Sequence, residues 1–343
     1  MHMSDALLSP AIGGAFWAVS GGLIAWSVKK SSIDQDGRKT ALMGVLGAFV
    51  FAAQMINFTI PGTGSSGHLG GGLLLTALLG PHRAFIALAS VLVIQSLFFA
   101  DGGLLALGCN IFNLAFFPAF VAYPFLYRTI AGNSLSAARL GAASITAATA
   151  GLLMGACFVV LQTTVSGITE LPFGTFMLFM LPVHLAIGIV EGLVTWAVVA
   201  FVAATEPTLL TMQHESKKNR SLTPAVFILI ALVTGGTLAW FASPYPDGLE
   251  WSMARTSGQE EIEGRHEPVH GTLSSIQEKI AFLPDYGFRS TGDAPSDSSD
   301  PASPVNTGTS VSGIAGSLMV LVLAGAIGLF TGAGMRKTEK TGE

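Results

Sequence analysis

The chain carries few charged residues for its length. Of its 343 residues, 11% are Asp, Glu, Lys or Arg, whereas 50% are hydrophobic. Soluble domains are about one quarter charged, so this composition excludes an ordinary soluble protein and indicates that lipid is the main solvent. A net charge of −4 provides no basic surface for nucleic acid, and we predict no nucleic-acid partner.

Cysteine and N-terminal basic residues are scarce as well. Cys109 and Cys157 lie in separate apolar stretches and form neither a metal-binding nor a redox motif. No Lys or Arg precedes the first apolar run, whereas a secretory signal peptide begins with a basic segment. We therefore expect this run to be retained, so that Met1 and His2 remain at the N-terminus of the mature protein.

Long apolar segments are what the chain does contain, and they predict an all-α, polytopic membrane bundle. A membrane-spanning helix needs about 20 residues. The third segment is too short to cross alone and is expected to be re-entrant or tilted. The bundle would have about seven helices plus two C-terminal helices, near residues 11–28, 41–58, 69–80, 84–100, 104–127, 140–163, 174–203, 223–242 and 312–334.

Basic residues predict how the bundle is oriented. Short cytoplasmic loops are enriched in Lys and Arg, whereas long loops cross the membrane regardless of charge. With the N-terminus outside and the C-terminus cytoplasmic, every basic residue beyond the long 243–311 segment falls on the cytoplasmic side. These residues are Lys29, Lys30, Arg38, Lys39, Arg83, Arg128, Arg139, Lys217, Lys218, Arg220, Arg336, Lys337 and Lys340.

Polar stretches divide the chain into three parts. Residues 1–203 are predicted to form a compact transmembrane domain, and residues 204–222 a cytoplasmic linker. Residues 223–343 would form an accessory unit, in which two transmembrane helices flank an acidic extracytoplasmic segment at about 243–311. An acidic surface attracts cations and could feed a metal site, but solvated charge without specific binding explains it equally well.

The second residue suggests a metal chelate at the N-terminus. The terminal amine, the backbone nitrogen of His2 and its imidazole can close a five-membered and a six-membered ring on one ion, once the backbone nitrogen loses its proton. Planar nitrogen ligation suits Ni(II) and Cu(II). The alternative is an ordinary exposed histidine, and His2 taken alone favours that alternative.

A glycine-rich stretch, Pro61-Gly-Thr-Gly-Ser-Ser-Gly-His68-Leu-Gly-Gly-Gly72, offers a fourth nitrogen. It is predicted on the same outer side as the N-terminus. Irregular backbone is tolerated at membrane depth where it lines a cavity within the protein, so His68 would point inward as a ligand. The alternative is a flexible outer loop with an incidental histidine.

Polar side chains inside apolar spans are costly in lipid and often mark functional pathways. Gln95, Asn110 and Asn113 are candidates to support the metal ligands, and Asn110 could orient a ligand histidine. His184 and Glu191 lie seven residues apart on one helical face. Hydrogen bonding between helices is the favoured role for Asn113, His184 and Glu191.

Several stretches together resemble the CbiM/NikM family, the substrate-binding membrane subunit of nickel/cobalt energy-coupling-factor (ECF) transporters. Over residues 1–203 they are Met1-His2 with Ser4-Asp5, Gly67-His68-Leu-Gly-Gly-Gly72, Leu79-Gly-Pro81, Gln95 with Phe98-Phe-Ala-Asp-Gly-Gly103, Leu107-Gly-Cys-Asn110-Ile-Phe-Asn113 and His184-Leu-Ala-Ile-Gly-Ile-Val-Glu191-Gly. Cys109 departs from the family pattern, in which a small residue such as Ala is expected. The segment Ser243-Pro-Tyr-Pro-Asp-Gly-Leu-Glu250-Trp is similar to the PDGLE-type accessory subunit, NikN, so the chain resembles a fusion of the two subunits.

The resemblance implies a substrate-capture permease subunit of an ABC-type importer, not an enzyme, in the cytoplasmic membrane of a prokaryote. Met1, His2 and His68 would bind Ni(II) or Co(II) as the transported ion, with no cofactor. A transmembrane coupling subunit and two ATPase subunits would be its partners. In line with this, the chain has no Gly-x-x-x-x-Gly-Lys-[Ser/Thr] phosphate loop of its own.

Three other classes of protein stay open at this point. A vitamin-binding or small-molecule-binding subunit of the same transporter class would show aromatic and polar residues around a large cavity. A membrane-embedded metalloenzyme would need clustered ligands or an acid/base pair near the metal, and we predict none; His266 and His270 would form a metal clip only on a helix. A purely structural bundle would leave the His68 stretch without a role.

Overall fold

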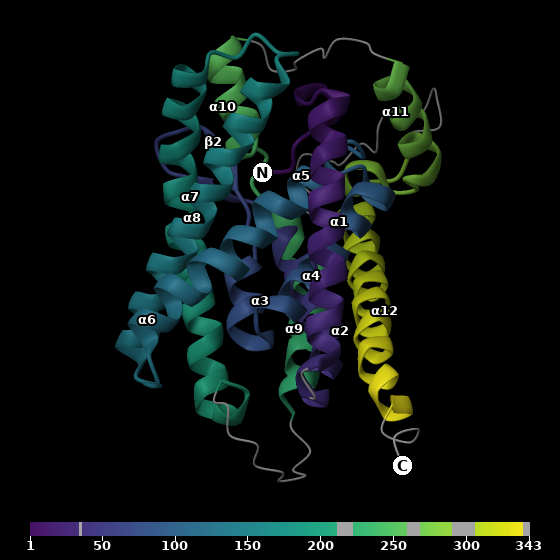
Figure 1. Ribbon diagram of the computed structural model, residues 1–343. Coiled ribbons are helices and arrows are strands. Elements are labelled where there is room, and N and C mark those ends of the chain that lie inside the picture. The colour runs from purple at the N-terminus through teal and green to yellow at the C-terminus, as the bar shows by residue number, and fades with distance from the viewer. Residues whose placement is uncertain (34–35, 211–221, 259–267, 290–305, 339–343) are drawn as a thin grey trace.

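The computed structural model describes residues 1–33, 36–210, 222–258, 268–289 and 306–338, and these form an elongated bundle of helices (Figure 1). Within these described ranges, six helical stretches are long and apolar enough to cross a membrane. They are α1 (Pro10–Ile33), α4 (Pro81–Phe99), the stretch Leu107–Ala131, α7 (Ala137–Ser166), α8 (Phe173–Thr205) and the first part of α12 (Thr307–Thr338). The prediction of an all-α, multi-pass membrane bundle is therefore confirmed.

The ends of several helices follow from local sequence. The Asp36 side chain accepts a hydrogen bond from Lys39 N and begins α2 (Gly37–Gln54), and Ser136 caps α7 in the same way. Proline has no N–H to lose at the first turn of a helix, and Pro81 begins α4. The left-handed backbone of Gly167 ends α7.

Three of the predicted spans are not single long helices in the structure. The third is α3 (Gly72–Leu79), which has only eight residues, all buried inside the protein. The fifth is divided into α5 (Leu107–Ile111), the π-helix η2 (Phe112–Tyr127) and α6 (Arg128–Ala131). The eighth is shortened to α9 (Thr223–Gly236), followed by the turn η4 (Leu238–Phe241).

The C-terminal part packs against the N-terminal part. Helices α9 and α12 both contact α2, while α7 and α8 form a long pair on the other side of the bundle (Figure 1). A continuous core with the fully buried side chains Phe51, Phe85, Phe99 and Phe176 joins these elements. Of the predicted 204–222 linker, residues 211–221 lie outside the described residues, and the described part holds the turn η3 (Pro207–Leu209).

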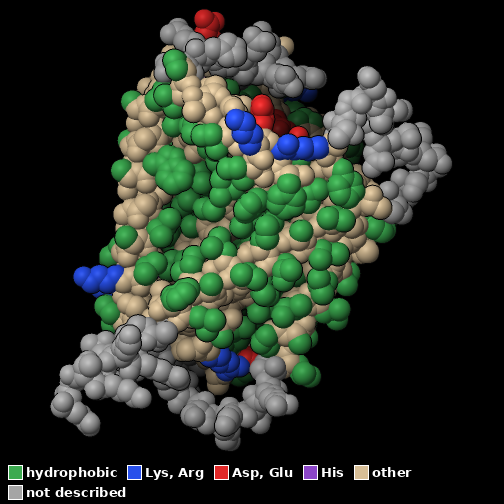
Figure 2. Space-filling view, turned by 90° about the vertical axis from the view of Figure 1, so that its right-hand side faces the viewer, with side chains coloured by type: hydrophobic (Ala, Val, Ile, Leu, Met, Phe, Trp, Pro, Cys, Tyr) green, Lys and Arg blue, Asp and Glu red, His purple; other side chains and the backbone are tan. Residues whose placement is uncertain are grey.

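The outer face of the bundle is apolar around its middle. Figure 2 shows hydrophobic side chains over the middle of one face, with the charged side chains toward its two ends. Large side chains that point outward include Trp17, Leu178, Leu229, Leu318 and Phe330. An apolar surface this extensive suits lipid, although the compartment that each end faces stays a prediction.

Five short elements gather at the end of the bundle drawn uppermost in Figure 1. Strands β1 (Phe58–Ile60) and β2 (Ser65–Gly67) form an antiparallel hairpin in which Phe58 lies opposite Gly67. The segment after α9 supplies α10 (Gly248–Ser257) and α11 (Pro268–Ile280), followed by the turn η5 (Pro284–Tyr286). The N-terminus lies among these elements, so this end of the bundle contains the candidate site.

Candidate metal-binding site

The first three residues run into the protein rather than over its surface. Met1 is 5% exposed and Met3 is fully buried. Asn110 fixes the backbone of Met3 at both groups, because Met3 N donates to Asn110 Oδ1 at 2.8 Å and Asn110 Nδ2 donates to Met3 O at 3.2 Å. Gly103 N also donates to Met3 O, at 3.0 Å. The position of Met1 and His2, the predicted ligands, is therefore set by hydrogen bonds to the backbone of the next residue, Met3.

The terminal amine and His68 lie side by side. Met1 N is 3.2 Å from His68 Nε2, and the rings of His2 and His68 stack with centroids 5.1 Å apart and planes 4° from parallel. Two nitrogens that bind one ion, each at about 2 Å, lie no more than about 4 Å apart. The amine and His68 Nε2 meet this limit, and the structure thus brings together Met1, His2 and His68.

His68 has the protonation state that a metal ligand needs. Burial, followed by the positive charges of the Met1 amine and His2, lowers the pKa of His68 to about 3. The neutral ring places Nδ1 3.1 Å from Leu69 O, to which Nδ1 donates. Nε2 then keeps its lone pair toward the amine, as expected when a second hydrogen bond sets the tautomer of a ligand histidine.

His2 faces a carboxylate in the structure. Its Nδ1 lies 3.0 Å from Asp101 Oδ1, and its buried Nε2 has no hydrogen-bond partner among the described residues. Tyr286 donates to the other oxygen of Asp101 at 2.5 Å. To close the six-membered chelate ring that the sequence predicts, His2 Nδ1 would have to leave Asp101.

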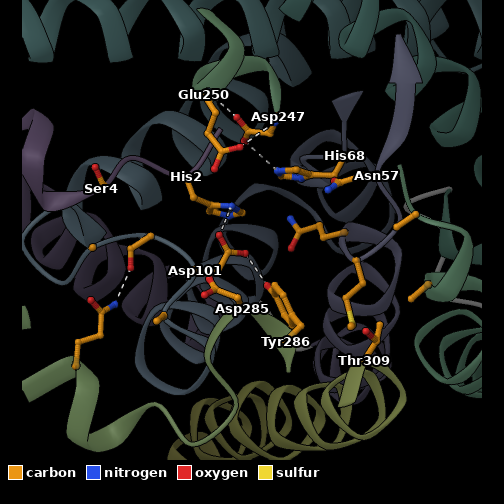
Figure 3. Close-up of a pocket in the computed structure, with 18 of the residues that line it drawn as sticks. His2, Ser4, Asn57, His68, Asp101, Asp247, Glu250, Asp285, Tyr286 and Thr309 are labelled. Atoms are coloured by element: carbon orange, nitrogen blue, oxygen red, sulfur yellow. Dashed lines mark hydrogen bonds and ion pairs between the residues drawn. The ribbon is translucent and has the colours of Figure 1, made fainter. Parts of the chain in front are cut away.

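A second carboxylate contacts the amine. Asp247 Oδ2 lies 2.6 Å from Met1 N and 4.0 Å from His68 Nε2. Burial opposes ionisation of Asp247, but the adjacent Met1 ammonium holds the pKa of this carboxyl below its ordinary range. Figure 3 shows Asp247 and Asp101 on two sides of the His2 and His68 rings.

The side chains of His2, His68, Asp101 and Asp247 border one polar cavity of about 650 Å³, which is also lined by Glu250, Asp285 and Gln277. Among the described residues, no group of three or more His, Cys, Asp and Glu side chains is arranged to hold a metal ion. The predicted ligand set does not depend on such a group, because two of its four nitrogens come from the main chain.

The loop that carries His68 is held from two sides. Gly70 N donates to Glu191 Oε2 of α8 at 2.9 Å, and Gln54 Nε2 of α2 donates to Gly70 O at 2.9 Å. Gln95 Nε2 in turn donates to Gln54 Oε1 at 3.0 Å. Glu191 and Gln95 therefore lie behind the loop rather than against the amine.

The two remaining candidates contact neither the amine nor His68. Asn113 and Gln162 exchange hydrogen bonds at 2.7 and 3.1 Å, which links η2 to α7. His184 Nδ1 lies 2.8 Å from Met180 O within α8, and its ring lies beside a small cavity that Met1 and His68 also border. His184 thus makes its hydrogen bond inside its own helix.

Residues 266–270, His-Glu-Pro-Val-His, have the H-E-x-x-H form of a zinc-peptidase motif, which the expectation of no clustered ligands overlooked. The motif works only on a continuous helix that places both histidines on one face. The structure describes α11 from Pro268 onward, and His270 Nε2 lies 2.9 Å from Leu8 O. His266 lies outside the described residues, so the pair is not described as a metal clip.

Sequence reasoning assigned no role to Asp101 and none of its own to Asp247. Asp101 and Asp247 both stand in stretches that carried the family resemblance, and Asp247 was also counted with the acidic residues of the outer segment. A signal was present for Asp247, because Asp followed three residues later by Glu before an apolar position is typical of a helix start. Its contact with Met1, however, spans 246 positions of sequence.

The fold and this site define a class of protein: a multi-pass helical membrane protein whose buried N-terminus lies at a polar cavity. More particularly, the chain belongs to the family described as the cobalt uptake substrate-specific transmembrane region, whose model matches residues 2–209. Residues 222–332 match the PDGLE domain. The family resemblance predicted from the sequence is confirmed for both parts.

Known relatives share this two-part organisation. A protein of Archaeoglobus fulgidus whose name describes a fused nickel transport protein, NikMN, is 33% identical over 334 residues, which cover 95% of this chain and 98% of the relative. The fused nickel transport protein NikMN of Rhodobacter capsulatus is 30% identical over 70% of this chain and 73% of its own. A crystal structure of a truncated transition metal transporter is 29% identical with a TM-score of 0.52, covering 60% of this chain and 99% of that one. These names describe transport proteins, in agreement with the prediction that the chain is a transport subunit and not an enzyme.

Proposed function

We propose that this chain is the membrane subunit that captures Ni(II) or Co(II) for an energy-coupling-factor importer. One observation carries the proposal: the terminal amine lies 3.2 Å from His68 Nε2, and the His2 ring stacks on the ring of His68. An amine and two imidazoles at the end of a buried segment are the donors that a borderline metal ion prefers. The names of the relatives agree with this cargo.

In the proposed complex, four nitrogens surround the ion: the Met1 amine, the backbone and imidazole nitrogens of His2, and His68 Nε2. The first three belong to one dipeptide, so their geometry is set by short chelate rings. His68 comes from a loop that Glu191 and Gln54 hold. Planar nitrogen ligation favours Ni(II) over ions that prefer tetrahedral sites, and we propose nickel as the preferred cargo.

Energy for release would come from other subunits. The sequence contains no phosphate-binding loop of the Gly-x-x-x-x-Gly-Lys-[Ser/Thr] type. We propose a transmembrane coupling subunit and two ATPase subunits as partners, in the cytoplasmic membrane of a prokaryote.

Metal titration tests this function. The purified protein, with its N-terminus at Met1 and any tag at the C-terminus, would be titrated with Ni(II), Co(II), Cu(II) and Zn(II) while its visible absorption is recorded. We expect one Ni(II) per chain and the absorption band of a square-planar complex. His2→Ala and His68→Ala should each abolish the band, whereas His184→Ala, a buried histidine beside the site, should keep it. Equal nickel binding by the wild type and both ligand variants would rule the proposal out.

A further inference from the structure

The segment that begins α10 comes from the second part of the chain but is fixed against the first. Ser66 in β2 donates through its backbone N to Pro246 O at 2.8 Å and through its hydroxyl to Tyr245 O at 2.7 Å. Trp251 Nε1 donates to Thr63 O at 3.0 Å. The hairpin that leads into His68 therefore also holds the residues on both sides of Asp247.

Close packing on α8 brings this segment to the site. A side chain at Gly248 would place its Cβ 2.6 Å from Val183 Cγ1 and 3.1 Å from the ring of His184. Only glycine permits this approach, and Gly248 is the first residue of α10. The residue before it, Asp247, is thereby placed next to the terminal amine.

The two oxygens of Asp247 make different contacts. Oδ1 accepts from Leu249 N at 2.8 Å and Glu250 N at 2.9 Å, which caps α10, while Glu250 Oε2 accepts from Asp247 N at 3.0 Å. Oδ2 is the oxygen that contacts Met1 N, at 2.6 Å. The cap fixes the rotamer of the carboxylate, and the second oxygen is thus presented to the amine in a set direction.

We propose that Asp247 is a positioning residue for metal capture: it holds the terminal amine of Met1 in place, so that the metal site of the first part of the chain is completed by the second. This inference rests on the proposed function. An amine bound to a metal ion still carries N–H groups, and one of them can donate to Asp247 while the lone pair faces the ion. The carboxylate also offsets the positive charge of the bound ion. Outer partners of this kind typically change metal affinity about 10- to 100-fold.

Asparagine at position 247 separates this role from helix capping. Asn and Asp cap helices about equally well, so Asp247→Asn keeps the acceptor for Leu249 N and Glu250 N. It replaces the oxygen at the amine with an NH₂ group, which cannot accept a hydrogen bond. Asp247→Ser is a second variant that keeps the cap and loses the amine contact. Glu250→Gln is the matched control, because it removes one negative charge from the same cavity without touching the amine.

The experiment measures Ni(II) affinity by calorimetry, thermal unfolding in detergent, and the rate at which formaldehyde and cyanoborohydride methylate the terminal amine in the absence of nickel. We expect Asp247→Asn and Asp247→Ser to weaken Ni(II) binding about 10- to 100-fold and to speed methylation of the amine. Both variants should also unfold at a somewhat lower temperature, because the ion pair with the buried amine is lost, but they should stay folded. Glu250→Gln should weaken binding by at most about fivefold and leave methylation unchanged.

Two outcomes would overturn the inference. Wild-type affinity and methylation in both Asp247 variants, with binding still lost in His2→Ala, would remove Asp247 from metal capture and leave the proposed function intact. Equal losses in Glu250→Gln and Asp247→Asn would show that Asp247 acts only through the charge of the cavity. Nickel binding that is indifferent to His2→Ala would instead contradict the proposed function itself.

Discussion

Asn110 acts on the predicted chelate through the main chain of Met3. Its side chain binds both the N–H and the C=O of that residue, which lies directly after His2. A buried amide that satisfies two backbone groups leaves both unpaired when it is removed, at a cost of about 1–3 kcal/mol for each group. The position of the terminal dipeptide therefore depends on a residue that need not touch the ion.

We predict that Asn110→Ala weakens Ni(II) binding at least about tenfold, because the unpaired backbone groups of Met3 no longer hold the terminal dipeptide in its binding position. Gln162→Ala is the control, since Gln162 forms a similar buried amide pair, but with the side chain of Asn113 rather than with the backbone of Met3. Calorimetry and thermal unfolding would be measured for both. We expect both variants to be less stable. If Gln162→Ala loses nickel affinity and Asn110→Ala does not, this role of Asn110 is refuted.

At the scale of elements, α8 holds the loop between β2 and α3. The hydrogen bond from Gly70 N to Glu191 holds the loop at a position two residues after His68. Helix α8 also packs closely against the first residue of α10, Gly248. One helix therefore positions both the His68 loop and the Asp247 segment. Helical periodicity predicted that His184 and Glu191 share a face, but it could not predict that this face would contact a loop.

We predict that Glu191→Ala lowers Ni(II) affinity, because the buried Gly70 N–H loses its acceptor, at a cost of about 1–3 kcal/mol. Glu191→Gln keeps an oxygen at the same place and should bind nickel within a few-fold of the wild type. A competition assay with a coloured chelator compares the two. If the Gln variant loses as much affinity as the Ala variant, the negative charge of Glu191 matters rather than its hydrogen bond.

On the scale of the whole molecule, the two parts of the chain depend on close packing between α2 and α12. A Cβ at Gly44 would lie 2.5 Å from the carbonyl oxygen of Leu321. We predict that Gly44→Ala destabilises the protein by about 1–3 kcal/mol, as overpacking does in cores. Gly21→Ala is the control, because nothing lies within 4 Å of that position. Thermal unfolding that is unchanged in Gly44→Ala would contradict this packing.

Local sequence predicted much of this molecule, and the limits of the prediction are physical. Hydrophobic length predicts helices, so α1, α4, α7, α8 and α12 fall where the apolar segments are. The third apolar segment, 69–80, was expected not to cross alone because it is shorter than the roughly 20 residues that a span needs, and the structure has the eight-residue α3 there. The chemistry of an amine beside His2 likewise follows from covalent structure. Contacts between distant segments carry no local pattern, and Asp247 and Asp101 at the site could be found only once the chain was folded.

The free amine of Met1 is the central claim, and adding residues before it tests that claim most directly. Ni(II) affinity would be measured for the protein beginning at Met1, for a variant with Gly-Ser added before Met1, and for a variant with Gly-Ser added after Glu343. The extension before Met1 moves the amine away from His2 and His68, so we expect high-affinity binding to be lost while the unfolding temperature changes little. The C-terminal extension should bind as the unmodified chain does. Undiminished nickel affinity in the protein extended before Met1 would contradict the account.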